Sequence, residues 1–310
     1  MPFDYVVYGI SLEANQPLPH LARGARHDVE AMLHVEFADE VPPNGTHLEY
    51  RDHRGVLEVT IGPGGRRVWM RLRGEDNPGT IGDATGVLVG PVLGGLLRLW
   101  GTVSLHGCVL DCGGEAVAVL GESGAGKSTL AAAMAQAGHS ILSDDLAAIT
   151  ERAPGDWWVA SGYPRLRLSP DSVAFLRRER DRAPDAGRVA PGSDRRYVSL
   201  DADGRSGWSC QAGGMALAAI YELRRVSGCQ APDAVPLAGV ERVATLVRHL
   251  KPAVVPLPPT VQADELRQLT RLAATIPIRR LLVPAGFEHL ADTCALLSDG
   301  GREGTESVLA

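Results

Sequence analysis

Residues 121–128 combine glycines, a lysine and a serine at a spacing that suits phosphate chemistry. They read GESGAGKS and fit the pattern G-x-x-x-x-G-K-[ST], with an apolar strand-like run before them at 116–120 and a helix-like run after them. Glycines let consecutive backbone N–H groups face phosphate oxygens, and the following helix N-terminus adds partial positive charge. Lys127 would reach the terminal phosphates, and the Ser128 hydroxyl would ligate Mg²⁺. The residues expected to bind the nucleotide are Gly121, Glu122, Ser123, Gly124, Ala125, Gly126, Lys127, Ser128 and Thr129.

The loop has two other possible interpretations. A glycine-rich turn can fit an eight-residue pattern by accident, but the flanking strand and helix favour a phosphate loop. A transporter-type ATPase would need an acidic strand about a hundred residues further on, preceded by an LSGGQ-like segment, and neither is visible in the sequence. Lys127 is one of only two lysines in the chain, the other being Lys251.

An acidic pair, Asp144 and Asp145, follows the loop at a useful interval. A helix from Ser128 and a strand at 141–143 use up the residues between them, so we expect that strand to lie beside the strand that feeds the loop. Both aspartates would then stand at a strand end near the phosphates. One carboxylate would hold Mg²⁺ and the other would accept a proton from an acceptor hydroxyl. The alternative is an Asp-Asp turn that caps the next segment.

His106 and two arginines complete the set of candidates. His106 precedes Gly107, ahead of the hairpin that leads to the loop, although a lone histidine is more often structural. Residues 183–194 are rich in Pro, Gly, Ala and Asp, which predicts a mobile loop. Arg195 and Arg196 follow it and could steady the charge on a transferring phosphoryl group; the alternative is a solvated strand end.

The elements around these residues predict an α/β protein. Residues 1 to about 85 are β-rich, with strands at 56–61 and 67–72. The apolar run at 87–101 predicts a buried helix, too short to span a bilayer. From Thr102 short buried strands alternate with helices. We therefore expect a smaller β-rich N-terminal region at 1–95, a P-loop catalytic domain at 96–298 and a disordered tail at 299–310.

Composition excludes several classes of partner. The net charge of −6 argues against nucleic acid, because phosphate backbones are held by clustered Lys and Arg. The N-terminus lacks a signal-peptide pattern and no apolar run reaches about 18 residues, so we expect a cytoplasmic protein with no membrane attachment. Five cysteines without a CxxC pair predict buried, reduced thiols rather than a disulfide framework or a zinc site.

Four short motifs together resemble the catalytic core of bacterial HPr kinase/phosphorylase. They are LHG at 105–107, GESGAGKST at 121–129, AGH at 137–139 and SDD at 143–145. The resemblance implies a P-loop α/β core related to PEP carboxykinase, with a mixed sheet and flanking helices. It also implies that the loop binds ATP, that Ser128 contacts Mg²⁺ and that Asp145 accepts the proton of a substrate serine. His106 would be an active-site partner and Asp144 a metal-side carboxylate.

The resemblance strictly covers about 101–150. Beyond it, segments such as 162–172 and 195–201 look like the HPr kinase-like proteins of peptide-tailoring clusters, which phosphorylate a precursor such as a lasso peptide on serine. The E-x-R-G-x-G motif of the HPr enzyme has no counterpart, and its K-loop and N-terminal domain are not recognisable. These departures argue against the reverse phosphorylase reaction and against HPr as substrate.

The expected function is therefore an ATP-dependent serine kinase whose substrate is a peptide or small protein, with oligomerisation left open. Residues 1–95 could form a groove for a peptide strand, a hypothesis that rests on their composition. Two alternatives remain: a small-molecule P-loop kinase, and a non-catalytic nucleotide-sensing module. Asp145 and His106 favour chemistry over sensing, because phosphate binding alone needs neither.

Overall fold

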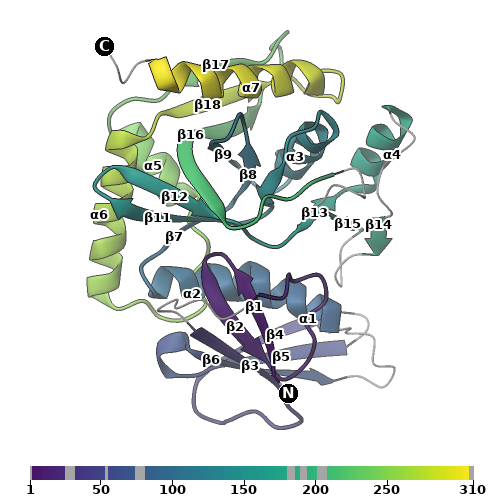
Figure 1. Cartoon of the computed structure of the whole chain (residues 1–310), viewed down its shortest axis with the longest axis vertical. Coiled ribbons are helices and arrows are strands. Elements are labelled where there is room, and N and C mark those ends of the chain that lie inside the picture. Colours follow the sequence, from purple (N-terminus) through teal and green to yellow (C-terminus); the bar gives the residue numbers. More distant parts are fainter. Residues whose placement is uncertain are drawn as a thin grey trace.

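The computed structural model describes residues 2–24, 32–52, 55–73, 81–179, 186–188, 194–200 and 208–306. A six-stranded sheet lies at one end, a larger mixed sheet at the other, and a helical run passes between them (Figure 1). The six-stranded sheet has the order β1-β2-β3-β6-β5-β4. Its strands are β1 (Phe3–Val7), β2 (Ile10–Ala14), β3 (Met32–Phe37), β4 (Thr46–Asp52), β5 (Gly55–Ile61) and β6 (Arg67–Arg73), with a short 3₁₀ turn, η1 (Pro63–Gly65), before β6.

The helical run comprises α1 (Ile81–Val87), a π-helical turn η2 (Leu88–Val92) and α2 (Leu93–Leu99). It starts six residues before the predicted helix, so the expectation that it is too short for a bilayer is wrong. Among the described residues it is the one helix long and apolar enough to cross a membrane, and 67% of it is buried inside the protein. Its apolar side chains join the core of the N-terminal sheet.

The larger sheet has the order β10-β8-β9-β16-β12-β11-β7, with β18 on β16 and β17 on β18. Strand β16 is long: its first residues pair antiparallel with β12, and later ones pair parallel with β9 and β18. The mixed α/β fold class predicted from the sequence is thereby confirmed. The strands are β7 (Val103–Leu105), β8 (Gly107–Asp111), β9 (Ala116–Leu120), β10 (Ile141–Ser143), β11 (Ala147–Ala153), β12 (Asp156–Ala160), β16 (Gly214–Arg225), β17 (Asp233–Pro236) and β18 (Ile278–Val283).

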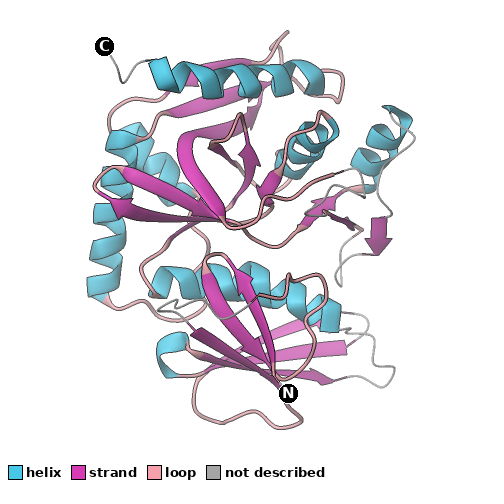
Figure 2. Ribbon diagram, viewed as in Figure 1, coloured by secondary structure: helices cyan, strands magenta, loops and turns pink. Residues whose placement is uncertain are grey.

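Helices cover both faces of this sheet (Figure 2). Side chains of α3 (Lys127–Gln136), α4 (Pro170–Glu179) and α7 (Leu290–Glu306) share one apolar cluster with the sheet. Side chains of α5 (Val240–Arg248) and α6 (Pro259–Thr275) share another. A third sheet, in the order β13-β15-β14, lies beside α4 and consists of β13 (Arg165–Leu168), β14 (Ala186–Arg188) and β15 (Arg196–Ser199).

The structure corrects three details of the sequence interpretation. Strand β10 pairs with β8 rather than with β9, so the acidic pair returns one strand further from the loop than expected. The predicted disordered tail at 299–310 is helical as far as Glu306, because each added turn of a helix whose start is already packed forms further backbone hydrogen bonds. Strand β14 falls within the loop predicted at 183–194, of which 183–185 and 189–193 lie outside the described residues.

The predicted division at residue 95 falls inside α2, so we place the boundary of the two regions after Leu99, where the helical run ends. All five cysteines are free, as expected, but only Cys108, Cys112 and Cys294 are fully buried. Burial raises the pKa of the Cys112 and Cys294 thiols to about 12, which suits thiols with a packing role.

Candidate active site

The glycine loop joins β9 to α3, as the sequence predicts. Gly124 and Gly126 have φ angles of 84° and 106°, a region that favours glycine, and Gly126 precedes the first residue of α3. A Cβ on Gly126 would lie only 2.8 Å from Nη2 of Arg225. Glu122, Ser123 and Gly124 are exposed. The bend therefore presents an open rim at the start of a helix, where backbone N–H groups suit phosphate oxygens.

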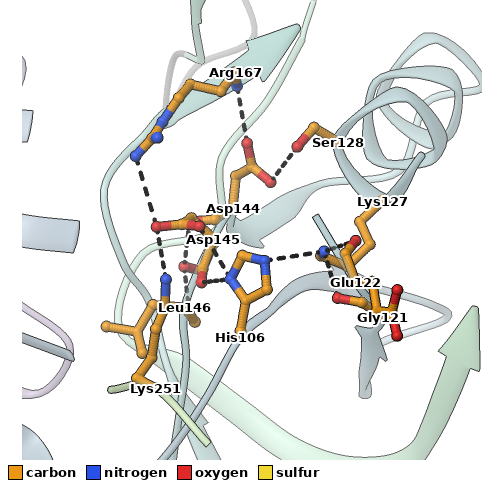
Figure 3. Close-up of polar contacts among 11 residues, drawn as sticks. His106, Gly121, Glu122, Lys127, Ser128, Asp144, Asp145, Leu146, Arg167 and Lys251 are labelled. Carbon is orange, nitrogen blue, oxygen red and sulfur yellow. Dashed lines mark hydrogen bonds and ion pairs between the residues drawn. The ribbon is translucent and has the colours of Figure 1, made fainter. Parts of the chain in front are cut away.

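Lys127 is almost buried, with 7% of its surface exposed. Its Nζ donates hydrogen bonds to the carbonyl oxygens of Gly121 at 2.7 Å and Glu122 at 3.0 Å, and lies 3.1 Å from Nε2 of His106 (Figure 3). Burial lowers the pKa of Lys127. A lysine ammonium only donates, so Nε2 of His106 accepts, and the ring hydrogen is left on Nδ1.

Asp144 is buried beneath the start of α3. Its Oδ1 accepts a hydrogen bond from Ser128 Oγ at 2.9 Å, and its Oδ2 accepts one from the Arg167 backbone N–H at 2.8 Å. Burial raises the pKa of Asp144. The carboxylate and the serine hydroxyl are thus held against each other at the edge of the loop.

These two oxygen groups fit a nucleotide-bound Mg²⁺. Magnesium prefers oxygen ligands and is usually held by one or two carboxylates together with substrate phosphates and water. Within the described ranges no three His, Cys, Asp or Glu side chains gather closely enough to hold a metal ion by themselves. Ser128 and Asp144 would therefore hold a metal that arrives with phosphates, rather than a resident ion.

Asp145 occupies the turn between β10 and β11. Its φ is 76°, a left-handed conformation that aspartate tolerates better than most residues, and the Ser143 hydroxyl stabilises the turn by donating to the Leu146 carbonyl at 2.6 Å. The Asp145 carboxylate keeps 24% of its surface exposed, and its Oδ1 lies 3.1 Å from Nδ1 of His106. The carboxylate therefore faces the site rather than the core.

Two cations that no sequence motif indicates also contact Asp145. Lys251 Nζ lies 2.8 Å from Oδ2, and Arg167 Nη2 lies 3.6 Å from the same oxygen. Burial raises the pKa of Asp145, but the hydrogen bond from His106 and the charges of Lys251 and Arg167 outweigh it and hold the pKa well below its ordinary value. Lys251 had one sequence signal: it is the second of only two lysines among 31 basic Lys and Arg residues.

Most of the predicted residues line one pocket of about 130 Å³, smaller than the roughly 300–1,000 Å³ of typical ligand sites; Gly121, Glu122 and Ala125 of the loop do not line it. A nucleotide would therefore lie partly on its rim. The lining residues are His106, Ser123, Gly124, Gly126, Lys127, Ser128, Thr129, Asp144, Asp145, Arg167, Ser169 and Arg195. The Thr129 hydroxyl bonds to Ser172 Oγ of α4 at 2.8 Å. Arg195 is half-buried, whereas Arg196 is exposed and does not line the pocket.

The sequence similarity of this chain to HPr kinase/phosphorylases covers a short segment. No protein-family model matches the chain. HPr kinase/phosphorylase of Bordetella pertussis is 41% identical over 58 residues, which is 19% of each protein, and that of Lachnoclostridium phytofermentans is 43% identical over 47 residues, 15% of each. The chain thus matches less than a fifth of these relatives' length.

A solved Hpr(Ser) kinase/phosphatase from Coxiella burnetii aligns with 67% of this chain and 99% of its own, at 10% identity and a TM-score of 0.33. A score this low does not establish a common fold. The resemblance to HPr kinase/phosphorylases is confirmed over the matched segment. Closeness to the kinases of peptide-tailoring clusters stays a prediction.

Proposed function

We propose that this HPr kinase-like chain is an ATP-dependent serine kinase that phosphorylates a peptide or small protein. One observation carries the proposal: the Asp145 carboxylate lines the same pocket as Lys127 and Ser128 of the glycine loop. Phosphoryl transfer depends mainly on positioning and electrostatic stabilisation, so a phosphate cradle and an acceptor for the hydroxyl proton could suffice.

The roles of the residues follow from their chemistry. The loop and Lys127 bind the phosphates of ATP, and Lys127 exchanges the carbonyl oxygens of Gly121 and Glu122 for phosphate oxygens. Ser128 and Asp144 would hold Mg²⁺, which would supply positive charge to offset that of the phosphates. Asp145 accepts the proton of the substrate serine as the serine oxygen attacks the terminal phosphorus; the bond from that phosphorus to the bridging oxygen breaks, and ADP leaves. His106 fixes one oxygen of that carboxylate.

Arg195 is the better of the two arginine candidates for contacting the transferring phosphoryl group, because it lines the pocket and Arg196 does not. Arg167, whose backbone contacts Asp144 and whose guanidinium lies near Asp145, is placed for a similar role.

We further propose that the acceptor is a ribosomal precursor peptide of the lasso type and that the enzyme works in the cytoplasm. The peptide would add to an edge of the N-terminal sheet, whose outer strands are β1 and β4. This part of the proposal rests on the sequence departures from the HPr enzyme. Peptide crosslinks found only after residue 101 would count against a groove in residues 1–95.

The test is incubation with ATP, Mg²⁺ and the peptide encoded beside the gene, followed by mass spectrometry for an added phosphoryl group. Lys127→Ala should lose nucleotide binding and transfer together. Asp145→Asn should keep nucleotide binding and lose transfer by about 10²–10⁴-fold, the usual contribution of a general base. Arg196→Ala, outside the pocket, is the control for Arg195→Ala.

Three results would contradict the proposal. Turnover of a metabolite with none on peptides would indicate a small-molecule kinase. Nucleotide binding without transfer to any acceptor, water included, would indicate a sensing module. Full transfer by Asp145→Asn would remove the proposed proton acceptor.

A further inference from the structure

Lys251 brings a buried positive charge to the carboxylate that faces the pocket. Its side chain is only 8% exposed, and its Nζ contacts Oδ2 of Asp145 at 2.8 Å. His106 contacts the other oxygen, Oδ1, at 3.1 Å. The two oxygens of one carboxylate are therefore held by side chains from different parts of the chain, as Figure 3 shows. Two contacts to separate oxygens fix the plane of a carboxylate, whereas either one alone would let it rotate.

Lys251 is itself fixed by its backbone. Its N–H donates to the Ser104 carbonyl at 2.9 Å, which ties the segment after α5 to β7. Its own carbonyl accepts a hydrogen bond from Arg98 at the end of α2. Arg98 in turn makes a two-pronged ion pair with Glu265 of α6, with both contacts at 2.7 Å and both side chains nearly buried. Three elements thus determine where the Lys251 side chain begins.

The helical run leaves room for the stem of Lys251. A Cβ on Gly94 would lie 3.2 Å from Cγ of Lys251, so a larger residue there would press on the lysine. One turn earlier, a Cβ on Gly90 would lie 3.5 Å from Oδ2 of Asp145 and 3.6 Å from Nη2 of Arg167. Because neither glycine has a side chain, the Lys251 stem and the Arg167 guanidinium have room to lie beside the Asp145 carboxylate.

We propose that Lys251 is a positioning residue for phosphoryl transfer: by holding Oδ2 it keeps the Asp145 carboxylate turned toward the pocket and the acceptor hydroxyl. The inference rests on the proposed kinase function. A lysine suits the task because its ammonium makes one contact and leaves other acceptor positions on the carboxylate open. An arginine fork would tend to engage both oxygens, including the one that His106 holds.

The test compares Lys251→Met with a matched control, Arg248→Met. Arg248 lies three residues earlier and is bonded to a different buried carboxylate, Glu222, at 2.9 Å, so its loss removes a cation from the same part of the chain without touching Asp145. Lys251→Met should lower kcat by about 10²-fold, the cost of a misplaced catalytic group. Its KM for ATP should change little, because Lys251 does not line the nucleotide pocket. Arg248→Met should leave kcat near that of the wild type.

A double-mutant cycle with Asp145→Asn separates positioning from general loss of structure. If Lys251 acts through Asp145, Lys251→Met should cost almost nothing further in the Asp145→Asn background. If the fold-loss of kcat in the double variant equals the product of the fold-losses in the two single variants, the inference is wrong. A raised KM for ATP with an unchanged kcat in Lys251→Met would also overturn it. Should Lys251→Met fail to fold, Lys251→Arg replaces it. A kcat equal to that of the wild type would contradict the need for a single lysine contact. A reduced kcat with an unchanged KM for ATP would support the positioning role of Lys251.

Assays of the wild-type protein distinguish failure of the Lys251 role from failure of the kinase proposal. Turnover of ATP by the wild type with an equally active Lys251→Met variant would defeat the role of Lys251 alone. A wild type that binds ATP but transfers its phosphoryl group to no peptide, metabolite or water would defeat the kinase proposal, and the role of Lys251 with it.

Discussion

Adjacent aspartates have opposite environments in this protein. Burial raises the pKa of Asp144, whose oxygens accept hydrogen bonds from Ser128 and a backbone N–H. Asp145 is surrounded by cationic and hydrogen-bonding groups, which outweigh burial and lower its pKa. Two carboxylates whose environments push their pKa values apart are suited to different tasks. The assignment of the metal to Asp144 rests on its contact with Ser128 at the edge of the loop, and that of the acceptor proton to Asp145 rests on its ionised, partly exposed carboxylate in the pocket.

This division predicts that Asp144→Asn acts through magnesium. An amide is a weaker ligand for a hard cation than a carboxylate, so the concentration of Mg²⁺ giving half-maximal transfer should rise by about 10-fold or more, in the range seen for altered metal sites. Titrating Mg²⁺ at saturating ATP measures the change. Asp145→Asn is the matched control, and an equal shift in both variants would contradict the assignment.

Glu222 allows a prediction about pH because it is a fully buried carboxylate surrounded by cations. Burial raises its pKa, but hydrogen bonds from Arg224, Arg280 and His249 outweigh that and lower it from about 4.5 to about 2. A carboxylate with a lowered pKa in the folded state adds stability above its unfolded pKa, and that stability is lost as the pH falls toward the folded value. The shift corresponds to a free energy on the order of 3 kcal/mol.

We therefore expect the free energy of unfolding to decline between about pH 5 and pH 2, and Glu222→Gln to remove part of that decline. Urea unfolding at several pH values measures it. Glu241→Gln, which removes a half-exposed partner of Arg280, should change stability by about 1 kcal/mol or less. Equal pH dependence in the wild type and Glu222→Gln would contradict the prediction.

The local motifs could be predicted from sequence because each is built by residues close together in the chain. The glycine loop, its strand and helix, and the acidic turn all follow from patterns within 116–145. Lys251 and Arg167 could not be found this way, since tertiary packing of α5 and the register of β13 bring them to Asp145. The place of β10 beside β8 likewise depends on strand pairing that no local pattern specifies.

At the scale of elements, neighbouring segments pack so closely against the helical run that some of its positions have room only for glycine. A Cβ on Gly95 would lie 2.6 Å from the backbone nitrogen of Val254, in the segment that follows Lys251. A Cβ on Gly86 would lie 2.6 Å from the Tyr197 hydroxyl. Contacts under 3.0 Å with backbone cannot be absorbed without movement, whereas the 3.5 Å contact at Gly90 is ordinary packing.

Two alanine substitutions in this helical run should therefore change the free energy of unfolding in different directions. Gly95→Ala should destabilise the protein by about 1–3 kcal/mol, the usual cost of overpacking. Gly90→Ala should be neutral or stabilising by up to about 1 kcal/mol, because alanine has the higher helix propensity. Chemical denaturation measures both. A destabilising Gly90→Ala with a neutral Gly95→Ala would show that the approach of the 252–254 segment is not what limits the run.

At the scale of the whole molecule, one hydrophobic cluster joins the two regions of the chain. The cluster around the helical run contains buried residues of the N-terminal sheet together with Leu146, Ala148, Tyr163 and Tyr197 of the P-loop region. The P-loop region also has two clusters of its own, one on each face of its sheet. The boundary between the two regions is therefore a packed apolar contact, and we expect their stabilities to be coupled.

We expect the full chain to unfold in one cooperative transition, with far-UV and near-UV circular dichroism changing together. A fragment of residues 102–310 would expose the apolar side chains that the helical run covers, so it should show no comparable transition. Two separated transitions in the full chain, or a stable and cooperative fragment, would contradict this coupling.

The change of pairing along β16 decides which face of the sheet each of its side chains occupies. Its register against β9 shifts between Leu217 and Ala219, and beyond this point Ala219, Tyr221 and Leu223 face α3 and α7 while Glu222 meets Arg248 of α5. Because side chains alternate across a strand, loss of the extra residue would swap these two sets. The carboxylate of Glu222, which the arginines now bind, would then lie in the apolar layer between the sheet and α3. One irregularity in the backbone therefore decides which face of the strand carries the charge.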